Sequence, residues 1–203
     1  MNKQGAYLQA LGGHCLDLYR LVTFDLGVPH SYSKFRQIDA VRKKTGARMM
    51  IETGTYLGVT ARRCSHTFEK VYTIELDPAL HAQASSWLSV RPNVEVILGD
   101  ALEKLPTVLA RDDVDDVLVF LDGHFSGGVT ALGDHPEPAV LEIEVLAKYQ
   151  DKIRAVIIDD FRCFGVDPGW PKKSELIASI ERSLGDRFDM SVHIDQVVLI
   201  RSR

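Results

Sequence analysis

Apolar residues occur along the chain in two alternating patterns: short continuous runs, and stretches in which they recur at three-and-four spacing. Short apolar runs are typical of buried strands, whereas three-and-four spacing is typical of helices that pack on a sheet. The predicted strands are residues 49–51, 71–74, 94–98, 117–121, 155–158, 188–194 and 197–200. Because a helical pattern separates each strand from the next up to residue 188, the sequence predicts a three-layer, doubly wound, Rossmann-like α/β fold.

The last two predicted strands are joined by a very short connection, which requires them to be antiparallel. We therefore expect a seven-stranded, mostly parallel sheet with an antiparallel last strand. Residues 1–46 predict a helical N-terminal lead-in, in which Ser33 can cap a helix and Gly46 can end it. The expected organisation is a single domain over residues 1–203, with the Rossmann-like core at 47–203.

A glycine turn at residues 52–58, with the sequence Glu-Thr-Gly-Thr-Tyr-Leu-Gly, joins the first predicted strand to a helical pattern. Gly54 permits a sharp backbone turn, and Gly58 permits the helix to approach the strand or a ligand closely. In α/β sheets, ligands bind in the crevice beyond the carboxyl ends of the strands. This turn is therefore where a nucleotide-like cofactor would bind, although a plain tight turn would also explain the glycines.

Acidic residues end the first five predicted strands or follow them directly. They are Glu52, Glu75, Asp100, Asp122 and the pair Asp159–Asp160. Any single one could simply cap a helix. Because the ends of parallel strands lie along one edge, however, the set predicts an acidic site, and Glu75 fits the carboxylate that binds ribose hydroxyls in nucleotide-binding βαβ folds.

Three of these carboxylates, Asp122, Asp159 and Asp160, should lie close together and would repel one another unless a positive charge neutralises them. A divalent cation would do so, and ligands that offer only oxygen favour magnesium, manganese or calcium. The alternative is that one of the aspartates caps the following helix while the others are solvated. The spacing alone leaves both interpretations open.

Composition narrows the function classes further. The chain has 203 residues, a net charge of −4 and a pI near 6.0, with its basic residues scattered, so nucleic-acid binding is disfavoured. Cys15, Cys64 and Cys163 form no Cys-x-x-Cys pair, which argues against a disulfide framework or a thiolate zinc site. The N-terminus predicts neither a signal peptide nor a membrane span. We expect a cytoplasmic protein that acts on a small molecule, with homo-oligomerisation left open.

Five segments together resemble a known family, the metal-dependent class I O-methyltransferases that use S-adenosylmethionine. The likeness is to the catechol, caffeoyl-coenzyme A and macrocin-type enzymes. The segments are the glycine turn with its middle tyrosine, Tyr-Thr-Ile-Glu-Leu-Asp-Pro at 72–78, Gly-Asp-Ala at 99–101, Phe-Leu-Asp at 120–122 and Ile-Asp-Asp at 158–160. Their order and spacing agree with the family from about residue 33 to residue 165.

The resemblance implies a role for each matching residue. Gly54 and the backbone around Tyr56 would hold the methionine part of the cofactor, Glu75 its ribose, and Asp100 with Ala101 its adenine. The full predicted cofactor site is Glu52, Gly54, Tyr56, Gly58, Glu75, Asp100, Ala101 and Asp122. The predicted metal ligands, for Mg²⁺ or another divalent cation, are Asp122, Asp159 and Asp160.

Asp122 and His124 are the predicted catalytic residues. The catechol enzymes use a lysine three residues after the first metal ligand, whereas this chain has Phe125 there, so His124 is the nearest substitute for a general base. His124 could instead orient Asp122 or bind the metal. The loops at 123–136 and 161–171 are expected to form the acceptor pocket.

The predicted activity is O-methylation of a hydroxyl on a small molecule, such as a sugar, a phenol or another secondary metabolite. One alternative is a methyltransferase that uses no metal. Alternatives of another class are a cofactor-binding protein without turnover and a nicotinamide-dependent oxidoreductase. Tyr56 argues against the oxidoreductase because it occupies the middle glycine of the dinucleotide fingerprint.

Overall fold

The structure is a computed structural model that describes residues 31–122 and 138–202, together with the single positions Gly12, Cys15, Tyr19 and Val22. The strands are β1 Met49–Thr53, β2 Lys70–Glu75, β3 Val94–Leu98, β4 Val117–Leu121, β5 Ile153–Ile158, β6 Phe188–His193 and β7 Gln196–Arg201. The helices are α2 Ser31–Thr45, α3 Val59–Cys64, α4 Pro78–Leu88, α5 Ala101–Leu109, α6 Ala139–Ala147 and α7 Lys173–Leu184. Short 3₁₀ helices, η1 Gln150–Lys152 and η2 Phe161–Cys163, flank β5.

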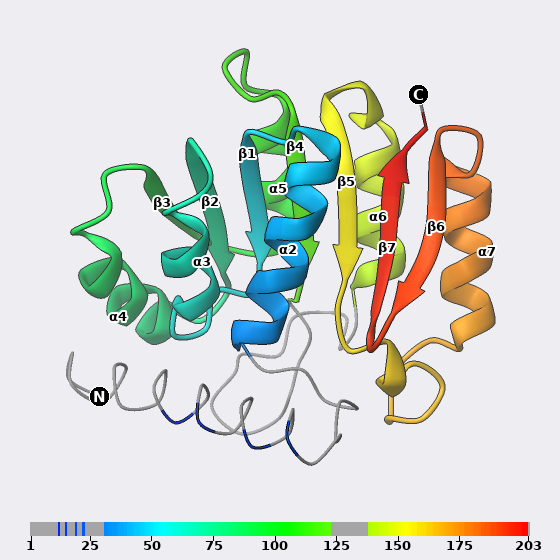
Figure 1. Cartoon of the computed structure of the whole chain (residues 1–203), viewed down its shortest axis with the longest axis horizontal. Helices are drawn as coiled ribbons and strands as arrows, with labels where there is room; N and C mark the ends of the chain where they lie inside the picture. Colours follow the sequence, from blue (N-terminus) through cyan, green and yellow to red (C-terminus); the bar gives the residue numbers. More distant parts are fainter. Residues whose placement is uncertain are drawn as a thin grey trace.

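The described residues form a seven-stranded sheet in the order β3-β2-β1-β4-β5-β7-β6 (Figure 1). Strands β1 to β5 pair in parallel, and β7 is antiparallel to both β5 and β6. This sheet confirms the predicted fold class, including the antiparallel last strand. The strand order reverses between β1 and β4, which is the topological switch point where ligands bind in such sheets.

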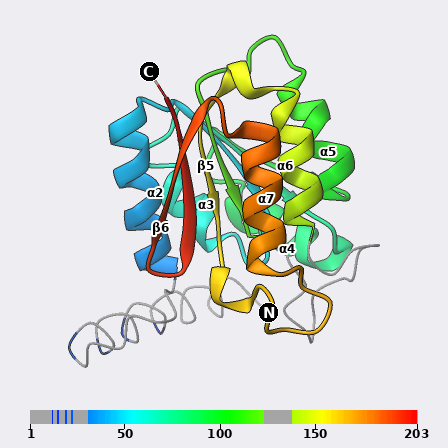
Figure 2. The ribbon, with the colours of Figure 1, turned by 90° about the vertical axis from the view of Figure 1, so that its right-hand side faces the viewer.

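Two layers of helices cover the sheet, with α2 on one face and α5, α6 and α7 on the other (Figure 2). The α2 side buries Ile38 and Val41 together with residues of α3 and α4. All five residues of β4 are buried, because this central strand is covered on both faces. The continuous apolar run at 117–121 therefore predicted the position of β4 correctly.

Local sequence accounts for where several helices begin and end. Asp77 caps α4, since its carboxylate accepts from the N–H groups of Ala79 and Leu80 at 2.7 and 2.9 Å, and Pro78 follows in the first turn. Gly46, at φ 72°, ends α2 as predicted. The prediction that Ser33 caps this helix is wrong, because α2 already begins at Ser31 and Ser33 lies within it.

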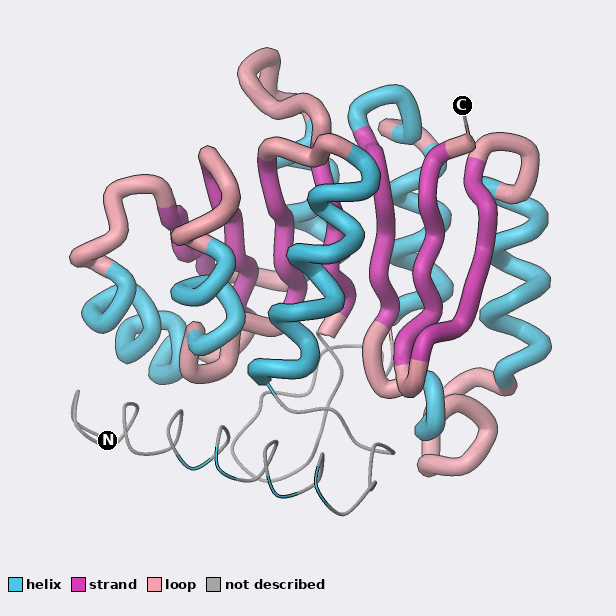
Figure 3. The backbone as a smooth tube through the Cα atoms, viewed as in Figure 1, coloured by secondary structure: helices cyan, strands magenta, loops and turns pink. Residues whose placement is uncertain are grey.

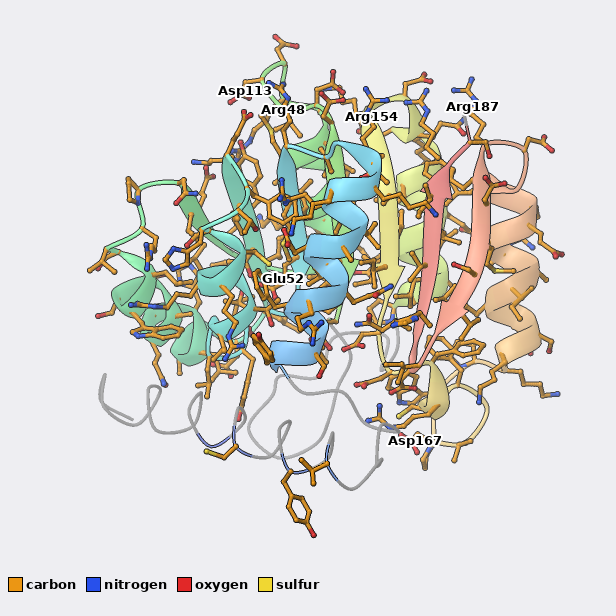
Figure 4. All side chains as sticks on the ribbon, in the orientation of Figure 1. Arg48, Glu52, Asp113, Arg154, Asp167 and Arg187 are labelled. Atoms are coloured by element: carbon orange, nitrogen blue, oxygen red, sulfur yellow. The ribbon has the colours of Figure 1, made fainter. Side chains whose placement is uncertain are left out.

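The parallel strands β1 to β5 all begin at one edge of the sheet and end at the opposite edge. Glu52 lies toward the edge where β1 ends, while Arg48, Arg154 and Arg187 lie at the opposite edge (Figure 4). The turn between β6 and β7 lies beside the segment that follows β5 (Figure 3), and the N–H of Phe161 donates to the carbonyl of Asp195 there at 2.9 Å. Within the described parts of the chain, no helix has the length and apolarity needed to span a bilayer.

Candidate functional site

The glycine turn after β1 has an unusual backbone. Gly54, Tyr56 and Gly58 all have positive φ, at 83°, 48° and 69°. Glycine adopts a positive φ without strain, whereas a residue with a side chain rarely does, and Tyr56 is also 42% exposed. A Cβ on Gly58 would lie 2.8 Å from Cδ1 of Leu88 in α4. Gly58 therefore leaves room for the Leu88 side chain of α4. Its predicted roles, in the approach of the following helix to the strand or of a ligand to the turn, stay predictions.

Glu75, at the end of β2, holds this turn in place. Its Oε2 accepts from the N–H of Tyr56 at 2.7 Å, and its Oε1 accepts from the N–H of Asp77 at 2.9 Å. Burial raises the pKa of Glu75, and the two backbone N–H groups partly offset that effect. An ionised carboxylate can accept about four hydrogen bonds, so acceptor capacity is left for a ribose hydroxyl. Glu75 thus holds the turn in place and is also a candidate to bind a ribose hydroxyl of the cofactor.

Glu52 lies beneath the turn rather than on its surface. It is 1% exposed, and its Oε2 accepts from the hydroxyl of Thr73 at 2.6 Å. The Thr73 hydroxyl is also 2.6 Å from that of Thr55, so the three side chains link β1, the turn and β2. Burial raises the pKa of Glu52 to about 8. This position supports the turn and does not offer Glu52 to a cofactor.

Asp100 caps α5, because its Oδ1 accepts from the N–H of Leu102 at 2.7 Å. Ala101 is the first residue of that helix, and both are half-buried at the same edge of the sheet as Glu75. The N–H of Gly99 donates to the carbonyl of Glu75 at 2.9 Å, which ties the end of β3 to the end of β2. Capping α5 does not prevent Asp100 from contacting the adenine of the cofactor, the role that the family resemblance implies for it.

Asp122, Asp159 and Asp160 converge as predicted, with one carboxylate oxygen from each lying within 4.8 Å of the others. Backbone bonds fix the strand ends that carry them: the N–H of Asp122 donates to the carbonyl of Thr53 at 3.1 Å, and that of Asp159 to Leu121 at 3.0 Å. Asp159 is fully buried, and its Oδ1 accepts from Nε2 of Gln196 in β7 at 2.9 Å. The cluster therefore lies at the ends of β4 and β5.

The ammonium group of Lys34, from α2, lies among these carboxylates. Its Nζ donates to Oδ2 and Oδ1 of Asp122 at 3.0 and 3.2 Å and forms an ion pair with Oδ2 of Asp159. Burial lowers the pKa of Lys34, but the negative charges of Asp122, Asp159 and Asp160 outweigh burial and raise it well above its usual value. Lys34 is therefore a fixed positive charge at neutral pH.

A second cation, the guanidinium of Arg162, contacts the cluster. Nη1 of Arg162 donates to Oδ1 of Asp160 at 2.7 Å, and the guanidinium also pairs with the carboxylate of Asp195. Asp195, in the β6–β7 turn and 3% exposed, additionally accepts from the backbone N–H of Arg162 at 2.7 Å. The predicted neutralising charge is a divalent ion, but two side chains of the protein itself, Lys34 and Arg162, already contribute positive charge to the cluster.

Sequence reasoning missed Lys34, although a signal was present. Lys34, Ile38 and Val41 are spaced as neighbours on one helix face, and the two apolar residues are buried. A lysine on the buried stripe of a helix needs an acidic partner, because an unpaired buried charge is costly. Its partner Asp122 is 88 residues away in the sequence, which is why local spacing did not reveal the pair.

Of the two loops expected to form the acceptor pocket, the structure describes only the one at 161–171. His124 and the loop at 123–136 lie outside the described residues, so their predicted roles stay predictions. The loop at 161–171 is anchored by aromatic packing: Phe164 is 1% exposed and lies edge-on to Trp170, with ring centroids 5.0 Å apart. Phe164 and Trp170 therefore tie this loop to the core on one face of the sheet.

The chain was compared with known proteins. No family model and no curated protein matches it. Among solved structures, the O-methyltransferase TomG from Streptomyces achromogenes, involved in tomaymycin synthesis and solved with SAM, is 21% identical over 97% of this chain and 90% of its own, with a TM-score of 0.59.

Two further structures show the same similarity. A putative caffeoyl-CoA O-methyltransferase from Staphylococcus aureus is 17% identical over 83% of each chain, with a TM-score of 0.56. SAM-bound CalS10, an amino pentose methyltransferase from Micromonospora echinaspora involved in calicheamicin biosynthesis, is 13% identical over 91% of this chain and 97% of its own, with a TM-score of 0.58. The chain therefore has the fold of S-adenosylmethionine-dependent O-methyltransferases, as the resemblance of its motifs predicted.

Proposed function

We propose that this protein is an S-adenosylmethionine-dependent methyltransferase that acts on a hydroxyl group of a small molecule. The observation that carries the proposal is the glycine turn at residues 52–58, held by Glu75 at the switch point of the sheet. A strained, exposed Tyr56 in such a turn is expected at a binding site rather than in a purely structural loop. The solved structures of TomG and CalS10, which share the fold and contain SAM, support the same assignment.

The charge of the crevice favours this cofactor over a dinucleotide. Glu75, Asp122, Asp159 and Asp160 all lie at the carboxyl ends of their strands. Because Lys34 and Arg162 offset the charge of the three aspartates, Glu75 is the carboxylate that would favour a positively charged sulfonium over a negatively charged pyrophosphate. A nicotinamide-dependent oxidoreductase is therefore the weaker candidate, which agrees with the lack of the middle glycine at Tyr56.

The chemistry would be a direct transfer, for which the cofactor supplies an electrophilic methyl group when bound. The acceptor oxygen gives an electron pair to the methyl carbon as the carbon–sulfur bond breaks, and the hydroxyl proton must leave. In this proposal the turn and Glu75 fix the donor. Asp122 belongs to the carboxylate cluster and lies beside the turn, since its N–H donates to the carbonyl of Thr53. His124 stays the proposed proton acceptor.

The sequence also predicts that a divalent cation bound by the three aspartates takes part in the reaction. The three aspartates form an oxygen-only ligand set that suits Mg²⁺ chemically. With the ammonium of Lys34 paired to Asp122 and Asp159, however, the arrangement does not fit a divalent ion in addition. The geometry therefore favours the alternative that uses no metal, and the proposed function does not depend on one.

Calorimetric titration with S-adenosylhomocysteine tests the proposal. We expect a micromolar Kd, about −8 kcal/mol, and no tighter binding of NAD. Glu75→Gln keeps one oxygen acceptor for the turn but loses the charge, so it should weaken binding by about 1 to 3 kcal/mol. Glu69→Gln, the same change at an exposed position just before β2, is the matched control. Tighter binding of NAD, or no binding of either ligand, would refute the assignment.

Turnover distinguishes an enzyme from a protein that only binds the cofactor. Release of S-adenosylhomocysteine in the presence of hydroxylated acceptors, such as sugars and phenols, would establish methyl transfer. A protein that binds S-adenosylmethionine tightly but releases no product with any acceptor would support the binding-protein alternative instead. Size-exclusion chromatography with light scattering would address homo-oligomerisation, which stays a prediction.

A further inference from the structure

The carboxylate cluster at the ends of β4 and β5 has a cation of its own. Nζ of Lys34 lies 3.0 Å from Oδ2 of Asp122 and pairs with Oδ2 of Asp159, while one oxygen from each of Asp122, Asp159 and Asp160 falls within 4.8 Å of the others. A divalent ion bound to these oxygens would need to approach each to about 2.0 to 2.6 Å. The ammonium group lies in the space that such an ion would need.

The helix that carries Lys34 holds it firmly in this position. Ile38 and Val41, one and two turns further along α2, are 0% and 4% exposed and belong to the core on this face of the sheet. The Lys34 side chain itself is only 16% exposed. Because its stem is packed and its ammonium is paired, Lys34 is part of the folded core and not a mobile surface arm.

The partner carboxylate is fixed just as well. Asp159 is fully buried, with Gln196 donating to one of its oxygens at 2.9 Å and Lys34 paired to the other. Both oxygens therefore already have a partner within the chain. A divalent ion that bound Asp159 would displace Gln196 or Lys34. Lys34 is the group that would be displaced, because it is positively charged like the ion.

We propose that the ammonium of Lys34 is the resident cation of this site, and that Lys34 and a divalent cation exclude each other there. An ammonium and a divalent ion that contact the same buried carboxylates would lie close together and repel each other strongly, so they do not share these carboxylates. An ammonium group has three N–H donors, and Asp122 and Asp159 are the acceptors bonded or paired with it among the described residues. This inference concerns the ion that the site holds and does not depend on methyl transfer.

Manganese titration of charge variants tests the proposal. Lys34→Met removes the ammonium while keeping an unbranched apolar stem, and Lys44→Met removes the same charge from an exposed position of the same helix. Calorimetric titration with MnCl₂ should show at least tenfold tighter binding to Lys34→Met than to wild type or Lys44→Met. Adding Asp159→Asn to Lys34→Met should abolish that gain, because the gained site uses this carboxylate.

The loss of Lys34 leaves three carboxylates near one another, so the variant is expected to be less stable without metal, and stability gives a second readout. Melting followed by circular dichroism should show Mn²⁺ raising the Tm of Lys34→Met, or refolding it from an unfolded state in chelator, with no shift for wild type. Lys34→Gln, which keeps N–H donors without charge, should behave in the same direction. Micromolar binding of Mn²⁺ to wild type would overturn the proposal, as would failure of both Lys34 variants to gain binding or stability.

Discussion

Glu52 provides a sensitive test of how this edge of the sheet is built, because burial raises the pKa of its carboxyl group from 4.5 to about 8. The hydrogen bond from Thr73 and the charge of Lys34 lower this pKa, whereas Asp122 and Glu75 raise it further. Between the two pKa values the folded chain keeps a proton that the unfolded chain has released. The free energy of unfolding must therefore fall as the pH rises through this window.

The size of the effect follows from the pKa difference. Each pH unit between about 4.5 and about 8 costs about 1.4 kcal/mol of stability. At pH 7 the wild type should therefore be less stable, by on the order of 3 kcal/mol, than a chain whose residue 52 cannot ionise. Glu52→Gln is that chain, and its amide oxygen can still accept the hydrogen bond from Thr73.

Urea unfolding at several pH values from about 5 to about 8 measures this difference directly. The free energy of unfolding of Glu52→Gln minus that of wild type should grow with pH and level off near the upper pKa. Glu69→Gln, which changes a side chain that is 62% exposed, should follow the wild type at every pH. A difference between Glu52→Gln and wild type that stays constant over the whole range would refute the reasoning.

Three further substitutions probe the turn and the carboxylate cluster. Gly58→Ala should lower the free energy of unfolding by about 1 to 3 kcal/mol, measured in urea, because its φ of 69° disfavours a Cβ that would also lie 2.8 Å from Leu88. Tyr56→Gly should leave stability within about 1 kcal/mol of wild type, since strain is relieved as unfolded-chain entropy rises, but should weaken S-adenosylhomocysteine binding in calorimetry. Asp159→Asn should cost about 3 kcal/mol in thermal melts with or without magnesium, because it removes a buried partner of Lys34; unchanged stability would contradict the pairing.

The fold was largely predictable from local sequence. The five parallel strands, the hairpin at the C-terminal end and the helix end at Gly46 each follow from patterns that span only a few residues. The start of α2 was placed wrongly, because Ser33 can cap a helix but Ser31, two residues earlier, begins it. Helix starts depend on backbone geometry that a side-chain pattern does not specify.

The candidate site was predictable only in part. Acidic residues at strand ends follow from the parallel sheet, so the convergence of Asp122, Asp159 and Asp160 could be inferred. Their cationic partners could not, because Lys34 lies in a helix before the sheet, and the way Arg162 is held depends on a turn far along the chain. Such pairs form only once the tertiary structure brings the elements together.

Glu75 illustrates the same limit within a correct prediction. Its place at the end of β2 followed from the sequence, and the ribose role followed from that place in a βαβ unit and from the family resemblance. Its second role is to hold the turn by accepting a hydrogen bond from the N–H of Tyr56. That bond depends on the left-handed backbone at Tyr56, and a tyrosine in the sequence does not predict such a conformation. Replacing Glu75 by alanine would therefore change the turn as well as the ligand contact, whereas glutamine separates the two effects better.

The carboxylate cluster links three parts of the chain through polar and charged side chains. Lys34 brings α2 to the ends of β4 and β5, Gln196 brings β7 to Asp159, and Arg162 connects Asp160 to the β6–β7 turn. A bound ion is not required to hold the acidic edge together, because each link supplies a donor or a charge from the protein. The arrangement makes the position of α2 and the charge of the site depend on each other, so a ligand that draws Lys34 away from Asp159 would also loosen the contact between α2 and the ends of these strands.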